Sequence, residues 1–133
     1  MVFLADFNQL ITESDPDASI ESLQEISFFA LLALINHTKD NTSSQKVAGQ
    51  SGAVETIIKQ LKNGVYDPKK TACVCLGQII QPPHNMENQE RLVKAKGVNL
   101  LSELISDEDD DELSEKAYKC LEHLGPLAIT QLL

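Results

Sequence analysis

Two stretches of this chain repeat one pattern of residue types at a constant spacing. The second stretch runs from Asn88 to Leu124, and the first lies upstream of it. Seven pairs of identical or similar residues stand 45 positions apart: Gly52 and Gly97, Lys46 and Arg91, Val47 and Leu92, Ala72 and Ala117, Cys75 and Cys120, Leu76 and Leu121, and Ile79 and Leu124. A repeat of this length is typical of α-solenoids, in which stacked helical units share a continuous core.

The composition favours helices over strands. Leu, Ile, Ala and Val make up most of the apolar 42%, aromatic residues contribute only 5%, and Trp is absent. This mixture suits packed helices more than a sheet. The length of 133 residues is enough for one domain with a core of its own.

Apolar periodicity and helix-ending residues predict three helices in each complete repeat. In the first repeat we expect helices over 44–49, 52–62 and 67–80. In the second repeat we expect them over 88–95, 98–105 and 111–124. Pro82-Pro83 and Gly125-Pro126 end the third helices, because proline cannot continue a helix.

The first 42 residues are expected to hold two helices of an incomplete unit. A short helix over 2–11 has its apolar residues on one face, and a long helix follows from Pro16 to about His37. An offset of 42 aligns Ala30 with Ala72 and Leu34 with Leu76. All four phenylalanines lie in this unit, and we expect them either to pack on the long helix or to dock another chain: Phe3, Phe7, Phe28 and Phe29.

The string N-x-E-R-L-V-x-A-x-G-V-x-x-L-x-x-L-I from Asn88, followed by A-x-x-x-L-x-x-L from Ala117, resembles the armadillo repeat. HEAT repeats are similar, but a glycine between the first and second helices, at Gly52 and Gly97, favours armadillo because it permits a sharp turn. The resemblance implies an all-α, right-handed α-solenoid of about two and a half three-helix repeats, forming one domain over residues 1–133. Its parts are an incomplete repeat (1–42), two complete repeats (43–85 and 86–125), and a terminal helix or the start of a further repeat (126–133).

In armadillo proteins the third helices line a concave surface that binds extended peptides or partner helices. The resemblance therefore implies a set of partner-binding residues: Leu32, Asn36, Lys70, Val74, Gln78, Glu115, Lys119 and His123. The family's peptide-binding asparagine is kept only at Asn36, and Gln78 and His123 replace it in the other units. No aromatic residue stands where importin alpha has tryptophan, which argues against binding of nuclear-import cargo.

Charge and cysteine content exclude several classes of function. The net charge of -9 disfavours binding to nucleic acid or to an anionic membrane. No apolar run approaches the roughly 20 residues of a membrane-spanning helix, and the start of the chain has no basic segment typical of a signal peptide. Three cysteines cannot all pair within one chain, which indicates an intracellular protein, cytoplasmic or nuclear.

Candidate chemical sites are weak in this sequence. Cys73 and Cys75 diverge by about 200° on a helix and cannot share one metal. The acidic run over 107–112 lacks the ligand spacing of an EF-hand, and we expect a solvated loop. We therefore expect no catalytic residues, no metal, no cofactor and no small-molecule substrate.

The predicted function is a non-catalytic protein-interaction module, or scaffold, that binds a protein or peptide. One alternative is a structural segment of a larger assembly packed through its ends, and another is a nucleic-acid-associated protein. Self-association or packing on a neighbour through Phe3 and Phe7 is a further possibility.

Overall fold

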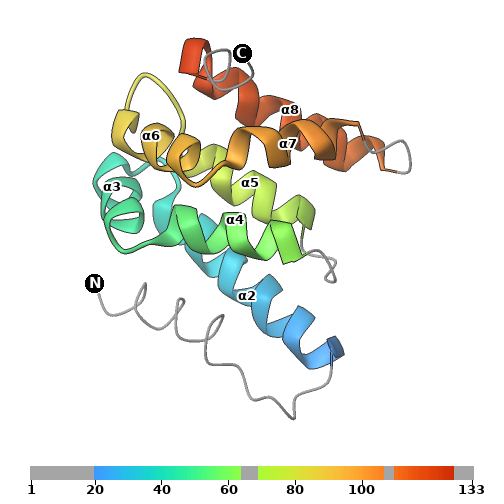
Figure 1. Cartoon of the computed structure of the whole chain (residues 1–133). Coiled ribbons are helices and arrows are strands. Elements are labelled where there is room, and N and C mark those ends of the chain that lie inside the picture. The colour runs from blue at the N-terminus through green and yellow to red at the C-terminus, as the bar shows by residue number, and fades with distance from the viewer. Residues whose placement is uncertain (1–19, 64–68, 107–109, 128–133) are drawn as a thin grey trace.

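The computed structural model describes residues 20–63, 69–106 and 110–127 of the chain. These residues form helices and no strands, which confirms the predicted all-α class (Figure 1). The helices, in chain order, are α2 (Ile20–Thr38), α3 (Thr42–Gln50), α4 (Ala53–Asn63), α5 (Lys69–Ile79), α6 (Met86–Lys94), α7 (Gly97–Ile105) and α8 (Asp111–Leu124). None of the described helices is long and apolar enough to cross a membrane. The short helix predicted over 2–11, with Phe3 and Phe7, lies outside the described residues.

Two groups of three helices follow α2, and their helix boundaries correspond. The first helices, α3 and α6, begin at Thr42 and Met86, and the second helices, α4 and α7, begin at Ala53 and Gly97, so both pairs are 44 residues apart. The third helices, α5 and α8, keep the predicted spacing of 45, because Ala72 and Cys75 are buried like Ala117 and Cys120. The spacing of 45 predicted for the first two helices is therefore wrong by one residue. One additional residue separates the second helix from the third in the C-terminal group.

The shift also changes the meaning of the two glycines. Gly52 has φ +90° and turns the chain between α3 and α4, a conformation that favours glycine. Its counterpart before α7 is Lys96, with φ +63°, and not Gly97. Gly97 is buried, and a Cβ built there would lie 2.7 Å from Ile58 Cδ1 and 2.8 Å from Leu92 Cδ2. Gly97 is needed for close packing and not for the turn that the sequence predicted.

The boundaries of α8 match their predicted positions, because both ends carry stop signals. Asp110 Oδ1 accepts a hydrogen bond of 3.0 Å from the Leu113 amide, which satisfies a donor in the first turn. Gly125, with φ +54°, ends the helix. Asn41 caps α3 in the same way, since its Oδ1 accepts from the Ser44 amide at 2.9 Å.

One continuous apolar core joins the helices. The helix α5 packs against both α2 and α8, and α7 packs against α8. In Figure 1, α5 lies between α2 and α8, and α4 and α7 lie on one side of this row. Leu31, Leu34, Ile57, Leu76 and Leu101 are fully buried within the core. This row of α2, α5 and α8 carries all eight residues that were predicted to bind a partner.

Buried polar side chains join each group of three helices to the helix before it. Gln45, the fourth residue of α3, donates from Nε2 to the Thr38 carbonyl at 2.8 Å. Gln89, the fourth residue of α6, donates to the Ile80 carbonyl at the same distance. Each glutamine thus satisfies a carbonyl at the end of the preceding third helix, where intrahelical partners are lacking. The same contact is made 44 residues apart, which fixes the stacking of successive groups.

Candidate functional site: the surface between α5 and α8

A hollow of about 270 Å³ lies between the two complete third helices. Its lining residues come from α5, from Gln81 just after it, and from α8: Cys73, Val74, Gly77, Gln78, Gln81, Lys116, Lys119 and His123. Four of the eight residues predicted to bind a partner are among them, namely Val74, Gln78, Lys119 and His123. The structure thus brings together residues from two repeats that are 45 positions apart in sequence.

Gln78 has a structural role that limits its part in binding. Its Nε2 donates to the Ile35 carbonyl at 2.7 Å and to Thr38 Oγ1 at 2.8 Å. A carboxamide nitrogen has two N–H donors, so both of them are engaged within the molecule. The sequence had predicted an amide free to bond a peptide backbone, and only the Gln78 carbonyl oxygen is left for that purpose. Gln78 instead ties α5 to the end of α2.

His123 offers a polar atom without a partner. Its ring is half-buried, and Nδ1 is shielded from solvent with no hydrogen-bond partner among the described residues. Burial lowers the pKa of His123 from its usual value of 6.5, and the nearby Glu122 carboxylate opposes this change. The imidazole is therefore neutral at neutral pH, and because Nδ1 is shielded from solvent, a ligand on this surface does not reach that atom in the described conformation.

The two predicted lysines are both ion-paired on the surface. Lys119 Nζ lies 3.6 Å from Glu115 Oε1 one turn away. Lys70 Nζ lies 3.1 Å from Glu112 Oε2 and 3.3 Å from Asp110 Oδ2. Hydrogen bonding first to Glu112 and then to Asp110 raises the pKa of Lys70. Lys70 therefore links the start of α5 to the start of α8, outside the hollow, and exposed pairs of this kind contribute little to stability.

The predicted residues of α2 do not line the hollow. Leu32 is half-buried on α2, and Asn36 is exposed on the same helix. Val74, at the position of α5 that corresponds to Leu32, is 38% exposed. These positions extend the candidate surface from α8 across α5 to α2.

The three cysteines of α5 and α8 are buried free thiols. Cys120 donates from Sγ to the Cys73 carbonyl at 3.3 Å. Burial raises the pKa values of Cys73 and Cys75 to about 12, and it raises that of Cys120 also. The thiols therefore remain protonated near neutral pH, which makes them poor nucleophiles and poor metal ligands. Cys75 and Cys120 occupy equivalent faces, as the repeat predicted.

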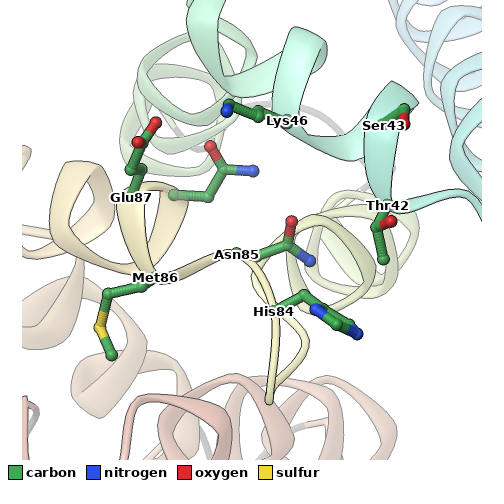
Figure 2. A pocket seen from close by; sticks show the side chains of 8 residues that line it. Thr42, Ser43, Lys46, His84, Asn85, Met86 and Glu87 are labelled. Atoms are coloured by element: carbon green, nitrogen blue, oxygen red, sulfur yellow. The ribbon is translucent and has the colours of Figure 1, made fainter.

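A second pocket, which the sequence did not predict, lies where the start of α3 faces the start of α6 (Figure 2). Its volume is about 350 Å³, and it is lined by Thr42, Ser43, Lys46, His84, Asn85, Met86, Glu87 and Asn88. A hydroxyl nucleophile needs a hydrogen bond to the base that activates it. Among the described residues, no such bond joins His84 to the hydroxyl of Thr42 or Ser43. Asn85 is the residue of this pocket whose type indicates a turn, because asparagine adopts the left-handed conformation more readily than most residues. Its φ is +70°, directly before α6.

Comparison of the chain with protein-family models, with curated proteins and with solved structures finds no match.

Proposed function

We propose that this chain is a non-catalytic protein-interaction module built as a right-handed, armadillo-like α-solenoid of about two and a half repeats. In this proposal, a peptide or a partner helix binds across the third helices α2, α5 and α8. The observation that supports it is the hollow between α5 and α8, which four residues of the predicted binding set line together. The repeated glutamine contacts of Gln45 and Gln89 support stacked units of one kind.

The chemistry of the hollow suits a peptide backbone with small apolar side chains. Val74 and Gly77 contribute apolar surface to the lining, and Lys116 and Lys119 contribute cationic donors. The Gln78 carbonyl oxygen can accept a hydrogen bond from a backbone N–H group, since only its Nε2 is engaged within the molecule. Apolar contacts combined with a few polar groups that fix orientation are typical of peptide recognition.

The test is site-specific photo-crosslinking in cell extract. A photoreactive residue is placed at Val74 or Lys119, and matched controls carry it at Glu55 and Glu103, which are exposed on the second helices α4 and α7. The proposal expects the same protein to be crosslinked from positions 74 and 119 and not from positions 55 and 103. Crosslinks found only from positions 55 and 103 would place the partner on the second helices and would contradict the proposal.

A pair of substitutions measures the contribution of the hollow once a partner is identified. We expect Lys119→Ala with His123→Ala to weaken binding while the thermal midpoint of unfolding stays the same, because both side chains are at least partly exposed. Gln78→Ala is unsuitable for this purpose, because it removes the link between α5 and α2.

A further inference from the structure

The third helices α2, α5 and α8 contact one another through two different faces. We call the face of a third helix that meets the following third helix its forward face. On α2 this face carries Leu31 and Leu34. The equivalent residues of α5, 42 positions later, are Cys73 and Leu76. All four residues are at most 1% exposed. The bond from Gln78 of α5 to Ile35 and Thr38 of α2, and the bond from Cys120 of α8 to Cys73 of α5, identify the helices that cover these faces.

Among the described residues, the forward face of α8 is partly exposed. Its residues at the positions of Cys73 and Leu76 are Tyr118 and Leu121, by the offset of 45. Tyr118 is 55% exposed, and Leu121 is only partly buried. Among the described helices, α8 packs mainly against α5 and α7. Tyrosine is enriched where proteins bind one another, because it combines a large apolar ring with a polar tip.

The opposite face, which meets the preceding third helix, is exposed on α2 among the described residues. On α8 this face holds Lys116, which borders the hollow against α5, and Cys120, which contacts Cys73. The equivalent residues of α2 are Phe29 and Ala33, 87 positions earlier. Phe29 is 64% exposed. Ala33 is half-buried, whereas the equivalent residues of α5 and α8, Cys75 and Cys120, are fully buried. Phe28 is 40% exposed, and its ring meets that of Phe29 edge to face with centroids 5.6 Å apart.

We propose that the open face of α8 in one copy of this chain docks on the open face of α2 in a second copy. The contact would continue the packing that α2 makes with α5, and α5 with α8, inside each molecule. One surface presents Tyr118 and Leu121, and the other presents Phe29 and Ala33, so each supplies the half-interface that the other lacks. Two different surfaces form a heterologous contact, which extends copy by copy and does not stop at a closed dimer.

The charge of the chain weakens this contact at low salt. Each copy carries a net charge of -9, and Asp111 and Glu122 are exposed on the same side of α8 as Tyr118. Salt screens repulsion between exposed charges. Self-association should therefore increase with ionic strength, whereas association through opposite charges would become weaker.

The test is sedimentation velocity of the full chain over a wide range of concentration, at low and high salt. We expect a series of species beyond the dimer that grows with concentration and with salt. Phe29→Asp and Tyr118→Asp should each be monomeric, because each blocks one of the two surfaces. Their mixture should form a dimer and nothing larger, because only one competent pair of surfaces remains. Met86→Asp is the matched control, since Met86 is 58% exposed on α6, away from both ends, and it should associate like the wild type.

Three results would overturn the proposal: a wild-type chain that remains monomeric at every concentration and salt, Phe29→Asp that still dimerises alone, or a mixture of the two variants that stays monomeric. The second result would indicate a symmetric contact through Tyr118, and the first would mean that the two faces do not bind each other. Circular dichroism checks that each variant folds, and the milder pair Phe29→Ser and Tyr118→Ser replaces any variant that does not. The proposal is independent of the surface between α5 and α8, because that surface is probed by Val74 and Lys119.

Discussion

Gly49 lies where α3 meets α6, and the space for a side chain there is already filled. A Cβ built on Gly49 would overlap Asn88 Oδ1 and lie 2.9 Å from Arg91 Nη1. Asn88 cannot move aside freely, because its Nδ2 donates to the carbonyls of Gln45 and Ile79. We expect Gly49→Ala to lower the free energy of unfolding by about 1–3 kcal/mol, as overpacking does, measured by chemical denaturation.

Gly77 is the matched control for this substitution. It also lies within a helix, but a Cβ there would meet only Cys120 Sγ, at an ordinary 3.6 Å. Gly77→Ala should raise stability by about 0.5–1 kcal/mol, because alanine favours the helix more than glycine does. Equal effects of the two substitutions would show that the contact between Gly49 and Asn88 is not restrictive.

Leu76 and Leu121 occupy equivalent positions in the repeat, but their surroundings differ. Leu76 is fully buried between α5 and its neighbours, whereas Leu121 is partly exposed on the open face of α8. The sequence predicted the same burial for both. We expect Leu76→Ala to cost about 2–5 kcal/mol and Leu121→Ala clearly less, in parallel urea titrations. A cost for Leu121→Ala as large as that for Leu76→Ala would mean that the forward face of α8 is covered.

At the scale of helices, the start of α8 depends on Asp110, which both caps the helix and pairs with Lys70. The hydrogen bond from the Leu113 amide, and then the interaction with Lys70, lower the pKa of Asp110 below its usual 3.8. A carboxyl whose pKa is lower in the folded state stabilises that state above its unfolded pKa, and this contribution is lost as pH falls through the folded value. The thermal midpoint of the wild type should therefore decrease as the pH falls below 3.8.

Two variants separate the cap from the ion pair. Asp110→Asn keeps an oxygen that can accept from the Leu113 amide but loses the charge, and Asp110→Ala loses both. We expect the thermal midpoint to fall further for Asp110→Ala than for Asp110→Asn. The decrease in the thermal midpoint at acidic pH should also be smaller for Asp110→Asn than for the wild type, because this variant lacks the Asp110 carboxyl group. If both variants melt at the same temperature, the cap does not stabilise α8.

Helix positions could be predicted where local signals coincide, and relations between helices could not. Apolar periodicity and Gly125-Pro126 at the C-terminal end placed α8 correctly. The first and second helices were misaligned by one residue, because Gly52 and Gly97 looked equivalent although one makes a turn and the other allows close packing. A glycine in a sequence does not tell which of these two requirements it meets.

The positions that form the candidate surface could be predicted from the sequence. Which of their polar groups are free to bind a partner could not. The repeat spacing and the armadillo resemblance together predicted Val74, Gln78, Lys119 and His123 as members of one set, and these four residues line one hollow. The bonds of Gln78 to α2 and the pairing of Lys70 with α8 depend on how the helices stack. The pocket at the start of α6 combines residues from the starts of α3 and α6 with His84 and Asn85 of the preceding turn, and the motifs used to predict the binding set do not include these positions.

The whole molecule has few units over which to distribute its stability. A helical repeat buries its apolar face only against its neighbours, so about three units are needed for a stable fold. The described helices share one apolar core, which extends from Leu31 of α2 to Leu124 of α8. Asn88 strengthens this continuity, because it bonds to residues of both α3 and α5. We therefore expect the groups of helices to unfold together and not one after another.

The buried thiols can measure this cooperativity. Cys75 lies in α5 and Cys120 in α8, and both are fully buried, so a thiol reagent reaches either one only when the structure opens. We expect both to react slowly in the native protein, with the same free energy of opening, equal to the free energy of global unfolding from denaturation. Leu76→Ala should lower the opening free energy of Cys75 and Cys120 equally, although it lies in α5. If Cys120 reacts faster than Cys75 in the native protein, then α8 opens separately and the two groups of helices are not one cooperative unit.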